Sequence, residues 1–408
     1  MIALELITNS NCNLDCYFCF AHHKEKTFLT FNEMKKAIDL ITDFADVKKE
    51  KEIFIKIYGG EPLLYNESLS ELLCYIETKS ENYNFEVAII TNGTIMPDSF
   101  LETVKKIINN NKYFLDFTFS LEGSKKLHNE IRHYKNSNVG SFDVLFDNMN
   151  KLRKELNWKR THVQTVLSPD LLNNIYNYIE FMEKHKEHLY FDLVPMFDTT
   201  FKNQDKKILD NIDILFNYYI KKIKEKDCEH IGIFQSQRSL CNLFNKSEKY
   251  HCNAGFEMIC VMSTGDVIPC SKFYHNDLNL DENSKYSKIY YNFALYGNIK
   301  NNSNEKIIKQ IMLKINHFKD ITKHSAECIE CQNKNEFGCT GSCIVENIQN
   351  NLKPYKYVCD YNIKFGQLSK KLKDECYSED GFINKFKYYQ TNKYKNFNNK
   401  FINFLRRK

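Results

Sequence analysis

The chain has 408 residues, 42% of them hydrophobic, so it can bury a large core and is long enough for one large domain and a smaller one. Its net charge of +5, from 57 basic and 52 acidic side chains, is too mild to indicate a nucleic-acid partner, and we expect no membrane span because no long apolar run or signal peptide occurs. Fifteen cysteines without a secretory signal predict a reducing, cytoplasmic setting in which clustered thiols hold metal or carry out redox chemistry.

From residue 2 to about 197, apolar runs typical of strands alternate with segments of helical period. A helix begins after Thr30, which forms a capping box with Glu33. The expected strands span residues 2–8, 52–58, 85–91, 113–122, 161–168 and 189–197, and the further helices lie near 68–78, after 97, near 144–156 and near 171–187. Six such alternations predict an α/β fold, a partial (β/α)6 TIM-like barrel of parallel strands with ligands at their carboxyl ends.

The remaining sequence predicts three further parts behind the barrel of residues 1–200. Residues 201–250 are charged and helical, typical of a bridge, and residues 251–362 concentrate eight cysteines in an irregular domain organised by metal. Residues 363–408 form a helical tail whose end carries eight Lys or Arg and no acid between 382 and 408. Such a tail can bind nucleic acid or an acidic peptide, although a solvated helix is the simpler interpretation.

Three cysteines, Cys12, Cys16 and Cys19, follow directly after the first strand. Structural zinc is usually held by four ligands in two close pairs, and only His22 and His23 lie nearby. A [4Fe-4S] cluster held by three thiolates is the other interpretation, and it leaves one iron open to a substrate or cofactor.

CNLDCYFC resembles the CxxxCxxC signature of the radical S-adenosylmethionine (radical SAM) enzymes, including an aromatic residue, Phe18, before the third cysteine. YGGEP at 58–62 resembles the GGE segment of that family, which contacts the amino group of the cofactor's methionine part. In this interpretation Gly59 and Gly60 allow close backbone approach, and Glu61 offers charge to an ammonium group.

Segments after the later strands extend the resemblance. TNGT at 91–94, SLEG at 120–123 and HNEIR at 128–132 are similar to family segments at those positions. The resemblance implies that Ser120 contacts the cofactor's ribose, that Arg132 binds its carboxylate or the substrate, and that backbone around Leu193 and Val194 meets adenine. A strand-end cap, a surface charge and an ordinary core strand are the alternatives.

The downstream cysteines are similar to the SPASM domain of radical SAM enzymes that modify peptides and proteins. The resemblance implies two auxiliary [4Fe-4S] clusters, the first held by Cys252, Cys260, Cys270 and Cys343 and the second by Cys328, Cys331, Cys339 and Cys359. Seven residues stand between Cys331 and Cys339 where the family usually has five, and a zinc ribbon is the alternative.

Together the motifs imply an anaerobic oxidoreductase in which reductive cleavage of S-adenosylmethionine gives a 5'-deoxyadenosyl radical that abstracts hydrogen from a peptide. Anaerobic sulfatase maturases typically carry Asp after the cysteine where this chain has Ser271, and a hydroxyl cannot replace a carboxylate base. We therefore expect a maturase of ribosomally synthesised peptides that forms an oxidised residue or a thioether or carbon-carbon crosslink. Its expected partners are the precursor peptide and a reductant such as flavodoxin or ferredoxin, with the leader bound either by a separate protein or by the basic tail after residue 380. A sulfatase maturase and a non-enzymatic iron-sulfur or zinc module are the alternatives.

Overall fold

The computed structural model describes residues 1–19, 26–195, 206–233, 254–273, 292, 294–321, 328, 331, 336, 343, 345 and 356–376. The chain divides into two compact units that are interleaved in sequence. Unit 1 comprises residues 1–119, 131–157 and 252–322, and unit 2 comprises residues 120–130, 158–251 and 323–408.

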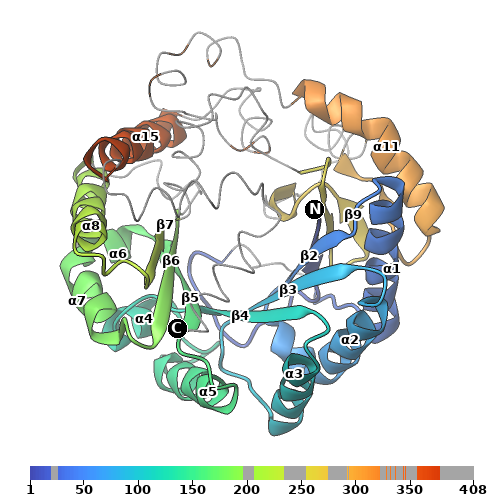
Figure 1. Ribbon diagram of the computed structural model, residues 1–408, viewed down its shortest axis with the longest axis horizontal. Helices are drawn as coiled ribbons and strands as arrows, with labels where there is room; N and C mark the ends of the chain where they lie inside the picture. The colour runs from blue at the N-terminus through green and yellow to red at the C-terminus, as the bar shows by residue number, and fades with distance from the viewer. Residues whose placement is uncertain are drawn as a thin grey trace. The chain divides into compact units, whose positions relative to one another are not determined.

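Unit 1 is built on a mostly parallel sheet in the strand order β10-β9-β8-β1-β2-β3-β4 (Figure 1). Strands β1 to β4 and β8 run parallel, whereas β9 and β10 are antiparallel to their neighbours. The strands are β1 (Ile2–Ile7), β2 (Glu52–Tyr58), β3 (Asn84–Thr91), β4 (Phe114–Ser120), β8 (Met258–Val261), β9 (Asp266–Ile268) and β10 (Gly297–Asn298).

Helices cover one face of this sheet, and the burial of the strand residues alternates accordingly. Ile53, Ile55 and Ile57 of β2 are at most 1% exposed, while Phe54 and Lys56 on the opposite face are half-buried. The α-helices in the described residues of unit 1 are α1 (Phe31–Val47), α2 (Asn66–Lys79), α3 (Asp98–Asn110), α5 (Phe142–Glu155) and α11 (Asn304–Ile321), and α11 packs against α1.

Unit 2 contains three parallel strands, β5 (Thr161–Leu167), β6 (Leu189–Pro195) and β7 (Ile231–Ile233). Its described helices are α4 (Lys125–Ile131, whose last residue belongs to unit 1), α6 (Pro169–Asn173), α7 (Ile175–His185), α8 (Lys206–Lys224) and α15 (Lys356–Cys376), and α15 packs along α8. The single helix expected at 171–187 is split at Asn174, whose side chain bonds the Asp170 carbonyl at 2.9 Å and so competes with the helical pattern.

The six strands predicted between residues 2 and 197 are all present, and further strands follow them in the chain. Strand β7 extends the sheet of unit 2, and β8 pairs in parallel with β1 in unit 1. Strand β8, with the sequence MICV, is short and lies in the segment that the sequence predicts to be organised by metal instead of by a large apolar core. Residues 377–408, which hold most of the predicted basic tail, lie outside the described residues, and the division into four domains stays a prediction.

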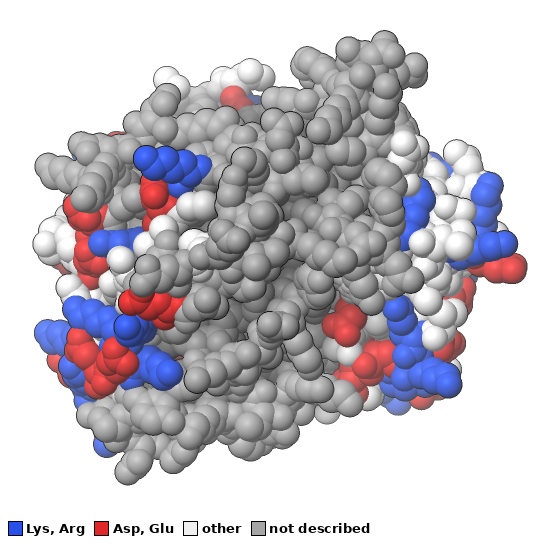
Figure 2. All heavy atoms as spheres, turned by 90° about the horizontal axis from the view of Figure 1, so that it is seen from above, with Lys and Arg blue, Asp and Glu red and all other residues white. Residues whose placement is uncertain are grey.

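The described surface carries no large patch of one charge on the face seen in Figure 2, where basic and acidic side chains are interspersed. In the part of the chain that the structure describes, the helices lack the combination of length and apolar character that crossing a bilayer requires.

Candidate functional site

The loops that follow β1 and β2 are joined by backbone hydrogen bonds in unit 1. Gly60 donates its N–H to the Asn9 carbonyl at 2.8 Å, and Glu61 donates to the Asn11 carbonyl at 2.7 Å. A Cβ atom on Gly59 would lie 2.4 Å from the Asn9 carbonyl oxygen, and one on Gly60 would lie 2.0 Å from that of Asn11. The close backbone approach predicted for this glycine pair therefore occurs between two loops of the protein itself.

The Glu61 side chain is fully buried and points into the protein. Its carboxylate accepts hydrogen bonds from Leu63 N at 3.0 Å, Thr91 Oγ1 at 2.7 Å and Asn92 N at 2.7 Å. Burial raises the pKa of this carboxyl to about 7, against these hydrogen bonds and the charge of Arg132, which lower it. The carboxylate oxygens thus join the ends of β2 and β3, and the predicted contact of Glu61 with a ligand's ammonium group stays a prediction.

Cys12 begins the three-cysteine loop and is half-buried. Its Sγ accepts hydrogen bonds from Leu14 N at 3.4 Å and from Asn92 Nδ2 at 3.7 Å. Burial raises the pKa of the Cys12 thiol to about 12, the Leu14 N–H lowers it, and the charge of Glu61 raises it. Because metal ligation needs a thiolate, assembly of a cluster here would release a proton from Cys12.

Arg132 lies beside the same loop. Its Nη1 donates to the Cys16 Sγ at 3.7 Å, and its guanidinium carbon is 5.2 Å from the centre of the Phe18 ring. A backbone hydrogen bond of 2.9 Å from Asp15 N to the His133 carbonyl fixes the two segments together. The structure thus brings Cys16, Phe18 and Arg132 together and places a cation next to a sulfur, while the predicted role of Arg132 toward the cofactor or substrate stays a prediction.

The residues of this loop fit an iron-sulfur cluster by the chemistry of their donors. Cys12, Cys16 and Cys19 are thiols close enough for Cys16 and Cys19 to raise the pKa of Cys12, and thiolates are the ligands that iron-sulfur clusters prefer. Among the described residues, no three His, Cys, Asp or Glu side chains converge tightly enough for a single metal ion. A cluster that binds one thiolate per iron does not need such convergence.

Ser120 and Val194 belong to unit 2. The residues after Ser120 are attached to β5, since Leu121 N donates to the Gln164 carbonyl at 3.1 Å and the Glu122 carboxylate accepts from Val166 N at 3.0 Å. Val194 is a half-buried residue of β6 whose strand partner is Val166. The predicted contacts of Ser120 and Val194 with a cofactor stay predictions.

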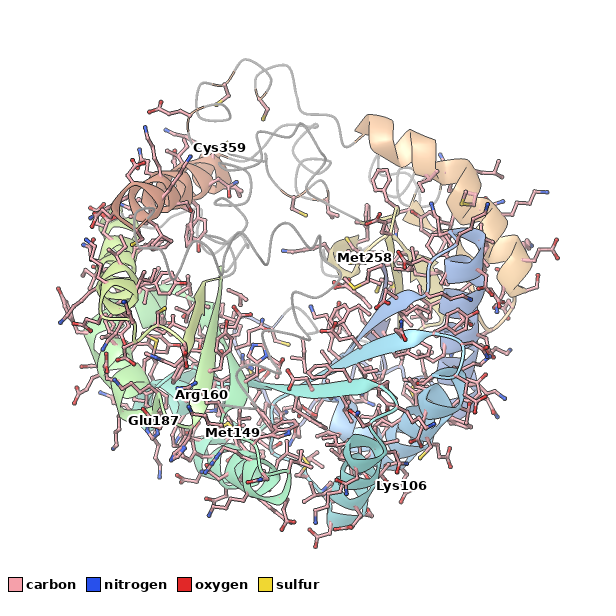
Figure 3. The ribbon with its side chains drawn as sticks, viewed as in Figure 1. Lys106, Met149, Arg160, Glu187, Met258 and Cys359 are labelled. Atoms are coloured by element: carbon pink, nitrogen blue, oxygen red, sulfur yellow. The ribbon has the colours of Figure 1, made fainter. Side chains whose placement is uncertain are left out.

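The downstream cysteines are divided between the two units. Cys260 is fully buried in β8, and Cys270, 6% exposed, precedes the short helix η3 (Ser271–Phe273) of unit 1. Cys328 and Cys331 form one turn, with a 3.4 Å bond from Cys331 N to the Cys328 carbonyl. Cys343 and Cys359 are half-buried in unit 2, Cys359 near the start of α15 (Figure 3), and Cys252 and Cys339 lie outside the described residues.

Several polar residues of the site were not predicted. Asn92 bonds both the Cys12 sulfur and Asn13 Oδ1, the latter at 2.9 Å, and Asn9 bonds the Glu61 carbonyl at 2.9 Å. Glu5 and Lys56, charged residues within largely apolar strands, pair across β1 and β2. The sequence offered one signal for the Glu5–Lys56 pair, because a charged residue within a strand that is expected to be buried needs a partner of opposite charge.

Comparison with known proteins relates this geometry to a family. Residues 6–181 match the model of the radical SAM superfamily. A cysteine-type anaerobic sulfatase-maturating enzyme of Clostridium novyi (strain NT) is 24% identical over 306 residues, which cover 69% of this chain and 77% of that enzyme. The chain spans only about half the length of two other relatives, 46% in each case, one of them the radical SAM cyclopropyl synthase TigE of Paramaledivibacter caminithermalis.

Two solved structures share the fold over most of the chain. Native anSMEcpe with bound AdoMet and Kp18Cys peptide matches with a TM-score of 0.68 at 17% identity, covering 91% of this chain and 98% of that one. Streptococcus suis SuiB bound to its precursor peptide SuiA matches with a TM-score of 0.61 at 18% identity, covering 87% and 75%. These likenesses confirm the predicted fold class, an α/β partial barrel with a C-terminal region.

Proposed function

Because this chain belongs to the radical SAM enzymes, we propose that it is a maturase that removes hydrogen from a ribosomally synthesised precursor peptide and leaves an oxidised or crosslinked residue. The observation that carries the proposal is the combination of the three-cysteine loop with a fold that matches anSMEcpe and SuiB over most of the chain. Both of those structures were solved with a peptide bound. A thioether or a carbon-carbon bond is the crosslink we expect.

In this proposal Cys12, Cys16 and Cys19 hold a [4Fe-4S] cluster, and S-adenosylmethionine completes it. The bound pair supplies a hydrogen-abstracting radical, which is chemistry that no side chain can provide. The Arg132 guanidinium beside Cys16 offsets part of the negative charge of the thiolates, and its stacking on Phe18 holds it there. Gly59 and Gly60 would let the loop after β2 lie close against the three-cysteine loop and so support the cofactor site.

We also propose two auxiliary [4Fe-4S] clusters, one held by Cys252, Cys260, Cys270 and Cys343 and one by Cys328, Cys331, Cys339 and Cys359. Oxidation of a peptide carbon releases an electron beyond the one that hydrogen abstraction removes, and auxiliary clusters would accept it. A low-potential reductant such as flavodoxin or ferredoxin would supply the first electron, and a separate protein would bind the leader of the precursor.

The test is an anaerobic assay of the reconstituted full chain with the peptide encoded next to its gene. We expect 5'-deoxyadenosine together with a mass change in the core of that peptide, and neither product from a variant in which Cys12, Cys16 and Cys19 are all replaced by alanine. Formation of 5'-deoxyadenosine with no change in any neighbouring peptide would contradict the proposed substrate class.

The sulfatase-maturating activity is a second candidate, favoured by the identity of 24% over 306 residues to such an enzyme. Against it, Ser271 stands where that group typically has Asp. A synthetic peptide with the cysteine of a sulfatase motif decides between the two, because conversion to formylglycine removes the sulfur of that cysteine and is read by mass spectrometry.

A further inference from the structure

Lys56, Glu5 and Cys260 form a row across three neighbouring strands of unit 1. Lys56 of β2 is the Cα partner of Glu5 in β1, and Glu5 is the partner of Cys260 in β8. Directly opposed residues on adjacent strands project from the same face, and such strands lie about 4.8 Å apart. Met258, labelled in Figure 3, is the first residue of β8 and shows where this strand lies. The pairing thus brings two opposite charges next to a predicted cluster ligand.

Glu5 is the centre of this row. It is 8% exposed, and its Oε1 lies 3.7 Å from the Lys56 Nζ. Its Oε2 accepts a hydrogen bond of 2.9 Å from the backbone N–H of Ser271, the residue that follows Cys270. Glu5 therefore lies opposite Cys260 in the sheet and bonds the residue after Cys270. These are the two cysteines of the proposed first auxiliary cluster that lie in the described residues of unit 1.

The Glu5 and Cys260 part of the row is shielded from water, whereas Lys56 is partly exposed. Cys260 is fully buried, and Tyr58, 6% exposed, lies with its ring centre 4.8 Å from the Lys56 Nζ. Burial raises the pKa of both the Tyr58 hydroxyl and the Cys260 thiol, and the charge of Glu5 acts in the same direction on both. Charges in such an environment are screened far less than charges in water.

We propose that Glu5 and Lys56 are positioning residues for the cluster held by Cys260 and Cys270 and that their opposite charges set its reduction potential. The inference rests on the proposed function, which assigns these cysteines to an auxiliary cluster. The two thiols suit iron-sulfur ligation by their softness, and neither is in a disulfide. Net charge and hydrogen bonds near a cluster are established determinants of its potential. A negative neighbour disfavours the added electron, and a positive neighbour favours it.

The test uses the full chain with Cys12, Cys16 and Cys19 replaced by alanine, so that only auxiliary clusters are reconstituted. The midpoint potential is followed by electron paramagnetic resonance during a redox titration. We expect Glu5→Gln to raise the potential of one cluster and Lys56→Met to lower it, while Glu5→Asp stays close to the parent chain. Asp39→Asn is the matched control, because Asp39 pairs with Lys79 on the helices of unit 1 at 2.7 Å and should leave the potential unchanged.

Two outcomes would overturn the inference while leaving the proposed function intact. One is a potential that stays the same in both Glu5→Gln and Lys56→Met with the full iron content, about eight irons for two clusters. The other is a shift of both variants in the same direction, which would indicate a general disturbance of the site. Lys56 tests the idea even if Glu5→Gln fails to fold, since its side chain is 35% exposed. A parent chain that binds no auxiliary iron would instead refute the proposed clusters, and the inference with them.

Discussion

At the scale of single residues, the site depends on side chains that connect loops as much as on those that would meet a ligand. Glu61 and Asn92 join the ends of β2 and β3 to the cysteine loop, with the Asn92 side chain also bonded to Asn13 at 2.9 Å. Gly60 is part of the same arrangement because its missing side chain is what allows the two loops to touch. The geometry of the cysteine loop is therefore set by its neighbours in the sheet.

Replacing Gly60 by alanine should disrupt this arrangement. The new Cβ would lie 2.0 Å from the Asn11 carbonyl oxygen, which is backbone and cannot rotate away. We expect a loss of stability of about 1–3 kcal/mol, as for overpacked sites, and a loss of iron from the first cluster. Urea unfolding of the apo chain and iron analysis after reconstitution measure the two effects. Full iron content in Gly60→Ala would contradict this account.

His230 gives unit 2 a dependence of stability on pH. It is 1% exposed, with its Nε2 3.4 Å from the Tyr218 hydroxyl, and burial lowers its pKa to about 4, against the charges of Asp227 and Glu183. In the unfolded chain His230 has its ordinary pKa near 6.5, so the unfolded state binds a proton at this residue more readily than the folded state does. Stability from this residue is complete above about pH 6.5 and is lost as the pH falls toward 4, by at most about 3 kcal/mol.

The measurement is urea unfolding of the apo chain at several pH values between 4 and 7. His230→Gln, which cannot take up the proton, should show a weaker loss of stability over this range than the unchanged chain. Neighbouring carboxylates such as Glu183 titrate in both proteins, so the difference between the two curves isolates His230. Parallel curves would refute the assignment.

At the scale of elements, helix α1 shows a start signal that works as the sequence predicted. The Glu33 N–H donates to Thr30 Oγ1 at 3.4 Å, and the Thr30 N–H donates to Glu33 Oε2 at 2.7 Å. Glu33 also pairs with Lys300 at 3.2 Å, which ties the start of α1 to the segment after β10. A local capping motif thus takes part in a contact between distant parts of the sequence.

Thr30→Ala should destabilise the chain by about 1 kcal/mol, the usual cost of losing a capping hydroxyl. Thr30→Ser keeps the oxygen and should lie close to the unchanged chain, so it serves as the control. Urea unfolding followed by circular dichroism measures both. Equal losses in the two variants would show that the threonine methyl group, and not the cap, matters.

At the scale of the whole molecule, a segment from the C-terminal half of the chain pairs with the first strand. Strand β8 of the C-terminal region pairs with β1 in parallel, and α11 packs against α1. The cysteines of β8 and of the segment after β9 are thereby built into the same sheet as the three-cysteine loop. The C-terminal region of unit 1 is part of the core of the fold.

A fragment of residues 1–200, the barrel expected from the sequence, should not behave as an independent domain. Without β8, strand β1 becomes an apolar sheet edge of the kind that pairs with other chains. We expect the fragment to elute as aggregates in size-exclusion chromatography, while the full chain does not. A monomeric fragment with cooperative unfolding would contradict this role of β8.

The sequence by itself determined the local features of the protein. Alternating apolar runs predicted the first six strands and their parallel order, and the spacing of Cys12, Cys16 and Cys19 predicted the cluster loop, because these signals lie within a few residues of each other. Only the tertiary structure decided that the Glu61 carboxylate points inward and that Lys56, Glu5 and Cys260 stand side by side. Glu5 and Cys260 are more than 250 residues apart, and the register of a parallel pair is set by the packing of the whole sheet, which no local pattern encodes.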